Sequence, residues 1–386
     1  MMGLGVGLIG SGYMGKCHAL AWTSVATVFP DVRRPRLVAL ADATPELARQ
    51  QAEAFGFGKG TGDWRDLISD PAVDVVSIAA PNEFHADMAV AALEAGKHVW
   101  CEKPMATSLE DAIRMRDAAR RSGKTAILGY NYIQNPMIRH ARTLIAEGKI
   151  GVVNHIRLEM DEDYMADPAE PFYWKSERRS GYGALDDFAV HPLSLLSILH
   201  GRITSLVADM AKPYEERPTR GDGYRLVENH DIAQALFRTD AGASGVLMVN
   251  RSAWGRKGRI ALQIFGSKGS ILFDQERMNE LQIYSTNDPL DLQGYRTILA
   301  APTHPPYRQF IAAPGHGLGF NELKVIECYE LLQAIFGEHD AHVIDFERGL
   351  EIERAVHAAA QSAEGGTWIN VGSVGFLMMP ETLNPS

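Results

Sequence analysis

The sequence has few cysteines and no excess of basic residues, and each absence argues against a class of protein. Its 386 residues include three cysteines, which are far apart and odd in number. That pattern is not a disulfide framework or a zinc site, and it favours a reducing compartment. Lysine and arginine number 38 against 48 aspartates and glutamates, for a net charge of −10. We therefore expect no nucleic-acid partner, because such partners require clustered basic residues.

Long apolar runs are also absent. No run approaches the roughly 18 residues that are needed to cross a bilayer. The N-terminus has no basic segment followed by a long apolar stretch, so a secreted form is not expected. We predict a cytoplasmic protein with no membrane partner, and its length favours two domains.

The pattern G-x-G-x-x-G occurs twice near the N-terminus, at residues 5–10 and 10–15. A dinucleotide fingerprint requires a strand before the glycines and a helix after them. The first copy fails this test because its own apolar residues form the expected strand at residues 4–9. The second copy passes, since residues 14–26 continue as an apolar, Ala-rich helical stretch.

Each glycine of the second copy has a predicted role. Gly10 makes the tight turn, and Gly12 lets the backbone approach a pyrophosphate. Gly15 lets the helix pack close to the strand, with the helix N-terminus facing the negative charge.

Asp42 ends a second apolar run at residues 36–41. An acidic residue there hydrogen-bonds the ribose hydroxyls of NAD and disfavours the 2′-phosphate of NADP. Its distance from the glycines exceeds the usual ~20 residues because residues 22–35 lengthen the connection. Helix capping before Pro45 is an alternative role and does not exclude the first. We predict NAD as the cofactor, with NADP less favoured.

Strands and helices alternate through the first 130 residues. Further strands are expected at 73–79, 97–101 and 125–128, and helices at 44–55, 63–69, 83–95 and 109–122. This alternation, with near-continuous apolar strands, is typical of a parallel sheet covered on both faces. We predict an α/β fold in which residues 1–130 form a Rossmann dinucleotide-binding domain.

Beyond residue 135 short strands follow one another closely. They are expected at 152–160, 203–210, 231–238, 244–250, 260–265, 270–273 and 281–284, with helices at 137–147, 185–200, 318–336 and 346–363. Pro192 should break or kink the helix at 185–200, and the Pro-rich residues 286–317 should form a lid or contact arm. We predict that residues 131–386 form an α+β domain with a large, mostly antiparallel open sheet. Its free face would meet substrate or a second subunit.

Three stretches follow strands of the predicted Rossmann domain, where such domains present loops to a ligand. They are residues 79–85 (AAPNEFH), 101–104 (CEKP) and 128–132 (LGYNY). In the second domain Asp187 and His191 stand four residues apart, which places them on one helical face. A lone pair of this kind is most often structural. No third ligand stands at a recognisable spacing, so we expect no metal site.

These motifs, in this order, resemble the glucose–fructose oxidoreductase/inositol dehydrogenase (Gfo/Idh/MocA) family. The resemblance rests on the glycine turn, on Glu-Lys-Pro at 102–104 and on Gly-x-Gly-x-Leu-x-Asp-x₃-His at 181–191. Residues 294–307 and 317–327 are similar to the levoglucosan dehydrogenase-like branch. The resemblance implies an NAD-dependent dehydrogenase that acts on a sugar, anhydrosugar or cyclitol as a homodimer or homotetramer.

The resemblance implies Lys103, Asp187 and His191 as the catalytic set. Oxidising a secondary alcohol to a ketone requires hydride transfer to nicotinamide and loss of the hydroxyl proton. His191 is the candidate base because the unperturbed pKa of histidine is about 6.5. Lys103 would hydrogen-bond the same hydroxyl and stabilise the developing alkoxide. Asp187 would bind a neighbouring hydroxyl or bias the other two electrostatically.

Two other functions stay open. A redox-initiated lyase or glycosidase would retain its NAD, oxidise the substrate transiently, eliminate a substituent and re-reduce the product. A non-catalytic nicotinamide-binding sensor is disfavoured because Lys103 and His191 are both present.

The wider site follows from the resemblance and from residue type. The expected cofactor-binding residues are Gly10, Gly12, Tyr13, Met14, Gly15, Asp42, Pro81, Asn82, His85, Glu102 and Lys103. The expected substrate-binding residues are Lys103, Tyr132, Gln134, Tyr164, Trp174, Arg178, Asp187 and His191, with aromatic faces meeting the sugar ring. Turn formation is the alternative for Asn82, and core packing is the alternative for Trp174. The chain departs from the family pattern at Ile133, Tyr182 and Ala189.

Overall fold

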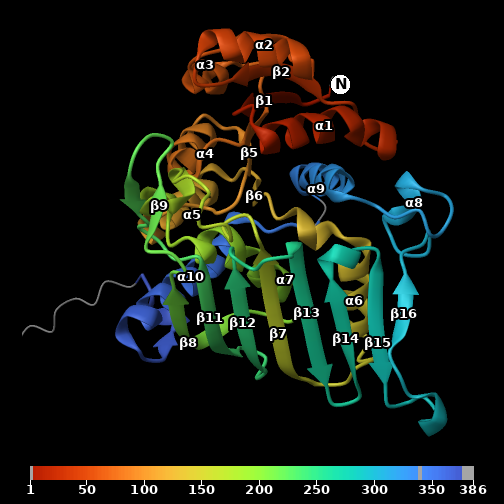
Figure 1. Cartoon of the computed structure of the whole chain (residues 1–386). Coiled ribbons are helices and arrows are strands. Elements are labelled where there is room, and N and C mark those ends of the chain that lie inside the picture. The colour runs from red at the N-terminus through yellow and green to blue at the C-terminus, as the bar shows by residue number, and fades with distance from the viewer. Residues whose placement is uncertain (1–2, 338–340, 376–386) are drawn as a thin grey trace, which may run out of the picture.

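The computed structural model describes residues 3–337 and 341–375. Residues 1–2 of the first predicted domain, and residues 338–340 and 376–386 of the second, lie outside this part. Two sheets organise the chain, one above the other in Figure 1. The first sheet is parallel and six-stranded, and the second is nine-stranded and mixed. The predicted α/β architecture is therefore confirmed.

The first sheet has the strand order β3-β2-β1-β4-β5-β6. Its strands are β1 (Gly5–Ile9), β2 (Arg36–Ala41), β3 (Lys59–Thr61), β4 (Val75–Ile78), β5 (His98–Cys101) and β6 (Ala126–Leu128). Every residue of β1 and β4 is buried, as expected for strands covered on both faces. The order reverses beside β1, so the crevice for a ligand lies at the carboxyl ends of β1 and β4.

Five helices connect these strands. They are α1 (Tyr13–Val28), α2 (Pro45–Phe55), α3 (Trp64–Ser69), α4 (His85–Glu94) and α5 (Leu109–Ser122). Local chemistry fixes several of their ends. Thr44 accepts a hydrogen bond from the amide of Leu47 at the start of α2, and Gly56 ends that helix in the left-handed region. Asp42 is therefore not the cap of α2.

The second sheet has the order β16-β15-β14-β13-β7-β12-β11-β8-β17. Its strands are β7 (Val153–Glu162), β8 (Ile203–Ala211), β11 (Ile232–Thr239), β12 (Ser244–Asn250), β13 (Lys257–Gly266), β14 (Gly269–Asp274), β15 (Glu280–Ser285), β16 (Arg296–Leu299) and β17 (Ile369–Asn370). The pairs are antiparallel, as predicted, except that β7 and β12 run parallel. The alternation of apolar and polar residues predicts a strand but not its neighbours, so the sequence did not indicate that β7 lies between β12 and β13.

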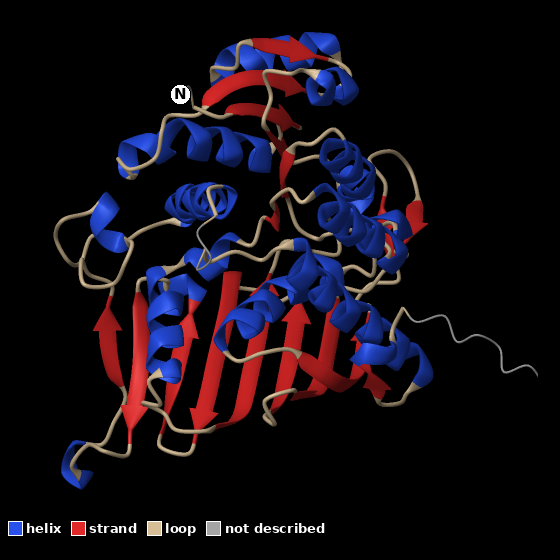
Figure 2. Cartoon of the chain, turned by 180° about the vertical axis from the view of Figure 1, so that it is seen from behind, coloured by secondary structure: helices blue, strands red, loops and turns tan. Residues whose placement is uncertain are grey.

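Helices cover one face of this sheet, as Figure 2 shows. They are α6 (Pro136–Ala146), α7 (Val190–Leu199) and α10 (Phe346–Gly365). The short α8 (Tyr307–Phe310) lies beyond β16, and α9 (Phe320–Ile335) returns to pack on α1 of the first sheet. The opposite sheet face, toward the viewer in Figure 1, carries half-exposed apolar residues such as Leu236 and Met248.

The structure corrects several details of the sequence prediction, and the short strands β3 and β17 were not expected. The residues 286–317, expected as a lid or arm without regular structure, contain β16 and α8. A small hairpin of β9 (Glu216–Pro218) and β10 (Tyr224–Leu226) was not expected. The helix predicted at 185–200 begins with a π-helical turn, Leu185–Ala189, before α7.

Pro192 was expected to break or kink this helix. It lies in the first turn of α7, where its missing N–H is tolerated. The main-chain carbonyl of Asp187, within the π-helical turn, accepts from Nζ of Lys103 at 3.0 Å. The π-turn is thus joined to the loop after β5.

Candidate active site

The glycine turn between β1 and α1 has the geometry that a phosphate turn requires. Gly10 has a φ of +91°, a conformation that favours glycine. A Cβ on Gly15 would lie 2.0 Å from the carbonyl oxygen of Gly10, so only glycine permits this packing. A Cβ on Gly12 would meet nothing within 4 Å. Gly5 and Gly7 lie within β1, so the first copy of the motif is strand.

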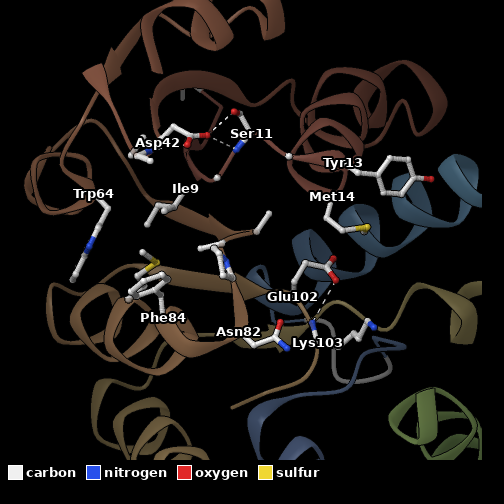
Figure 3. Close-up of a pocket in the computed structure, with 18 of the residues that line it drawn as sticks. Ile9, Ser11, Tyr13, Met14, Asp42, Trp64, Asn82, Phe84, Glu102 and Lys103 are labelled. Atoms are coloured by element: carbon white, nitrogen blue, oxygen red, sulfur yellow. Dashed lines mark hydrogen bonds between the residues drawn. The ribbon is translucent and has the colours of Figure 1, made fainter. Parts of the chain in front are cut away.

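A large cavity of about 820 Å³ opens from this turn (Figure 3). It runs between Asp42 and Trp64 on one side and Glu102 and Lys103 on the other. The residues that line it also include Gly10, Gly12, Tyr13, Met14, Pro81, Asn82, Phe84, Trp174, Lys175 and Asp187. We call it the cofactor pocket.

Asp42 stands at one end of the cofactor pocket with both carboxylate oxygens fixed. One oxygen accepts from the amide of Ser11 at 2.8 Å and from its hydroxyl at 2.5 Å, and the other accepts from the amide of Ala43 at 2.6 Å. Figure 3 shows the Ser11 contacts as dashed lines. A held carboxylate at the end of β2 suits a ribose diol and opposes a phosphate in the same place.

The pocket fits a dinucleotide. Gly12 is the N-cap of α1 and offers no side-chain cap, and the first turn of the helix holds no acidic residue. The N–H groups at this helix end therefore suit a pyrophosphate. The cavity's volume lies within the usual range for cofactor sites, about 300–1,000 Å³.

A smaller pocket of about 300 Å³ adjoins the first, and we call it the substrate pocket. Five residues line both: Met14, Glu102, Lys103, Lys175 and Asp187. The others that line the substrate pocket are Gly129, Asn131, Tyr132, Met160, Glu162, Tyr164, Tyr173, Phe188, His191 and Phe320. The junction between the two pockets thus contains two of the three residues implied as catalytic, and the third lines the substrate pocket.

Asp187 is surrounded by cations. Nζ of Lys103 lies 3.2 Å from Oδ1, and Nζ of Lys175 lies 2.9 Å from Oδ2. The hydroxyl of Tyr164 donates to Oδ2 at 2.5 Å, and Arg251 lies 3.9 Å away. Burial alone would raise the pKa of Asp187, but Lys175, Lys103 and Arg251 hold that pKa well below its usual range. Asp187 is therefore a fixed anion.

His191 is buried in the first turn of α7 and lines the substrate pocket. Its Nδ1 is buried with no hydrogen-bond partner among the described residues. The ring of Tyr132 meets it edge-on, with centroids 4.9 Å apart. Burial, and then the charge of Lys103, lower the pKa of His191 well below 6.5. The imidazole is therefore neutral near pH 7 and able to accept a proton.

Glu102 is fixed by a buried cluster beneath the junction. Nζ of Lys324, on α9, lies 2.5 Å from Oε1 of Glu102 and 2.7 Å from Oε2 of Glu327. Nε2 of His18, on α1, lies 2.8 Å from the same Glu102 oxygen. Burial would raise the pKa of Glu102, but Lys324 and His18 hold it below its usual range. The return of α9 to the first sheet thus stabilises an anion in the wall of both pockets.

Most other predicted residues line these pockets, and four do not. Gly15 lies behind the turn, packed on the Gly10 carbonyl. His85 is buried, with ring nitrogens 2.8 Å from the carbonyl of Pro104 and 2.9 Å from that of Ala80, so it supports the Lys103 loop from behind. Gln134 is also buried and bonds the carbonyl of His342. Arg178 is exposed and lines neither pocket. Trp174, expected at the sugar, lines the cofactor pocket instead.

Sequence reasoning missed several lining residues. Lys175 directly follows Trp174, and Phe320 ends the stretch GLGF at 317–320. Glu162 ends β7, where the alternation of the predicted strand could have been followed two residues further. Burial and the charge of Asp187 raise the pKa of Glu162. No local signal marks Lys324, because its partner Glu102 lies 222 residues away.

Two features are absent from residues 3–337 and 341–375. No group of three or more His, Cys, Asp or Glu residues there is arranged to hold a metal ion. No helix in that part is long and apolar enough to span a membrane.

A Rossmann sheet, an open phosphate turn and a lysine–aspartate–histidine set at a pocket junction define a nicotinamide-dependent oxidoreductase. Comparison with known proteins agrees. Residues 4–130 match the model of an oxidoreductase family with an NAD-binding Rossmann fold, and residues 138–272 match the GFO/IDH/MocA C-terminal domain. The chain belongs to the Gfo/Idh/MocA family, and it is an NAD(P)-dependent dehydrogenase with an NAD-binding domain.

Individual relatives match over almost the whole chain. The levoglucosan dehydrogenase of Pseudarthrobacter phenanthrenivorans is 35% identical over 97% of this chain and 100% of its own length. A solved NAD binding oxidoreductase from Klebsiella pneumoniae is 40% identical, with a TM-score of 0.92, covering 96% of this chain and 99% of its own. Levoglucosan dehydrogenase in complex with NADH and levoglucosan is 35% identical, with a TM-score of 0.91, covering 96% of this chain and 100% of its own.

Proposed function

We propose that the protein oxidises a secondary hydroxyl of a sugar, anhydrosugar or cyclitol to a ketone, with NAD as the hydride acceptor. The observation that supports this most is the pairing of Lys103 with Asp187 where the two pockets join, with His191 in the wall of the substrate pocket. In this proposal residues 1–130 bind the cofactor and residues 131–386 bind most of the substrate.

The chain's own residues handle the hydroxyl proton. Bound NAD supplies the hydride-accepting ring. The neutral imidazole of His191 accepts the hydroxyl proton, and the ammonium of Lys103 donates a hydrogen bond to the oxygen as negative charge develops there. Asp187 holds that ammonium through its carboxylate and its main-chain carbonyl. Glu102, held ionised by Lys324, lies on the cofactor side of the same junction.

The substrate pocket suits a small polyol. Its volume of about 300 Å³ admits a single ring, and its walls combine charged groups with the aromatic faces of Tyr132, Tyr164 and Phe320. The named substrate of the levoglucosan-binding relative belongs to the same class.

We also propose a homodimer or homotetramer in the cytoplasm. The uncovered sheet face, with Leu236 and Met248 about half exposed, supports self-association.

The test is a panel of sugars, anhydrosugars and inositols with NAD⁺ and with NADP⁺, following reduction of the nicotinamide. Wild-type protein should reduce NAD⁺ with at least one polyol. Lys103→Ala and His191→Ala should each lower kcat by about 10²- to 10⁴-fold. Wild-type rates in both variants would contradict the proposal. Turnover of a glycoside by purified protein without added NAD⁺ would instead establish the redox-initiated lyase or glycosidase.

A further inference from the structure

Lys175 is a second lysine at the pocket junction, opposite Lys103. The two ammonium groups flank one carboxylate: Lys103 lies 3.2 Å from Oδ1 of Asp187, and Lys175 lies 2.9 Å from Oδ2. They reach it from different parts of the chain, since Lys103 follows β5 and Lys175 lies in a short 3-10 turn, Trp174–Ser176. Both line the cofactor pocket and the substrate pocket.

The segment that carries Lys175 is firmly held. Its main-chain carbonyl accepts from Nδ2 of Asn229 at 2.8 Å and from the hydroxyl of Ser180 at 3.2 Å. Asn229 is itself buried and accepts from Arg251 at 3.1 Å. Nζ of Lys175 also lies 5.1 Å from the ring centroid of Tyr164, which favours a cation. These contacts distinguish Lys175 from a mobile surface lysine.

The ammonium of Lys175 has N–H donors that are not used within the described residues. An ammonium has three N–H donors, and within the described residues Nζ makes one hydrogen bond, to Asp187. Its side chain is 30% exposed and lines both pockets. Two donors are therefore available to a ligand.

The charges around the junction favour an uncharged ligand. Lys103 and Lys175 share the carboxylate of Asp187, Glu162 lines the same pocket, and Glu102 is paired with Lys324. A site with no net excess of positive charge gives little advantage to an anionic substrate. Hydroxyl groups suit it better, because each hydroxyl both donates and accepts.

We propose that Lys175, with Asp187, binds the hydroxyl adjacent to the one that is oxidised, so that the substrates of this protein are vicinal diols. The proposal rests on the proposed function and deepens it. Lys103 and Lys175 lie on different oxygens of the same carboxylate. With a diol bound beside Asp187, each ammonium can therefore donate to a different hydroxyl. Lys103 serves the reacting hydroxyl, and Lys175 serves its neighbour.

The test compares Lys175→Met with wild type on the best polyol and on its two monodeoxy analogues, which lack one or the other hydroxyl beside the oxidised carbon. Lys175→Met should lower kcat/KM for the diol by about 10- to 100-fold, the usual effect of losing a hydrogen bond to a charged group. On the deoxy analogue that lacks the hydroxyl bound by Lys175, the same variant should lose less than about 3-fold, because the partner is already gone. Lys175→Arg should recover part of the rate on the diol.

Two controls separate binding from folding. Lys149→Met removes an exposed lysine that pairs with Glu147 at 3.6 Å, and it should leave all rates unchanged. Far-UV circular dichroism spectra should be the same in wild type and Lys175→Met, which shows that the variant folds; if it does not fold, Lys175→Gln replaces it.

Equal losses on the diol and on both deoxy analogues would overturn the vicinal-diol assignment, as would wild-type rates in Lys175→Met. Either outcome leaves the proposed function standing, since wild type still oxidises the polyol. Failure of wild type on every polyol would overturn the proposed function itself.

Discussion

Lys324→Met is the variant for which the structure makes the strongest stability prediction. The lysine is fully buried and stands between two carboxylates, Glu102 at 2.5 Å and Glu327 at 2.7 Å. Methionine has a similar length and removes only the charge. The variant therefore leaves buried carboxylates without their cation, at the place where α9 meets the first sheet.

The magnitude follows from these distances. At an effective dielectric constant of about 20, a unit charge pair at about 2.6 Å attracts by roughly 6 kcal/mol. The cost of burying the charges offsets much of this attraction. Removing one partner of a buried pair nevertheless costs about 3–5 kcal/mol, because the other charge stays buried. We expect Lys324→Met to lower the free energy of unfolding by that amount at pH 8.

The loss should depend on pH with a definite sign. In wild type Lys324 and His18 hold the pKa of Glu102 below the pKa that this carboxyl has in the unfolded chain. Ionised Glu102 therefore stabilises the fold at pH values above the unfolded pKa. Without the lysine, burial raises the pKa of Glu102 above the unfolded value, and that of Glu327 is already raised to about 7. In the variant, Glu102 and Glu327 take up protons as the pH falls, and this removes the cost of burying their charges without a cation. The stability difference should shrink between pH 8 and pH 5.5.

Equilibrium urea unfolding followed by tryptophan fluorescence measures this difference. Trp100 lies beside the cluster, with Nζ of Lys324 5.3 Å from its ring centroid. Glu327→Gln is the matched control within the cluster, because it keeps the pair of Lys324 and Glu102, and it should cost less than about 2 kcal/mol. A loss in Lys324→Met below about 1 kcal/mol at pH 8, or one that is equal at both pH values, would refute the reasoning.

Three further predictions concern the two pockets. Gly12→Ala should fold like wild type, because the added Cβ meets nothing within 4 Å, but it should weaken NADH binding by about 10-fold or more. Gly15→Ala should instead lower the unfolding temperature, because its Cβ would lie 2.0 Å from the Gly10 carbonyl oxygen. Calorimetry and NADH titration separate these outcomes. Asp42→Ala should raise the ratio of kcat/KM with NADP⁺ to that with NAD⁺ by about 10-fold, and an unchanged ratio would argue against a ribose contact. Because burial lowers the pKa of His191, kcat/KM should not fall between pH 8 and pH 6 through this residue. A limb near pH 6.5 that disappears in His191→Asn would contradict that assignment.

The sequence predicted best where a residue type has a single structural use. Gly10 and Gly15 could be assigned because a positive φ and a close carbonyl each require glycine. The strands β1 and β4 could be assigned because they are buried on both faces and so are almost continuously apolar. Local chemistry was sufficient at these positions. The strand β3, which is not buried, was not predicted.

Contacts between residues far apart in the sequence could not be predicted from local patterns. Gln134 was expected at the substrate, but the carbonyl of His342, 208 residues away, binds its amide. Lys175 reaches Asp187 only because Asn229 and Ser180 position its loop. The parallel pairing of β7 with β12 depends on which strand enters the middle of the sheet. None of these partners is marked by spacing or periodicity.

The π-turn at Leu185–Ala189 has a consequence for how position 187 can be studied. Lys103 is tethered twice to Asp187, by the carboxylate and by the main-chain carbonyl. The second tether belongs to the backbone, so it survives any exchange of the side chain. A neutral residue at 187 would remove the counter-charge while the lysine keeps its place. The fold thus divides two tasks that most ion pairs combine: the backbone sets where the ammonium stands, and the side chain supplies the opposing charge.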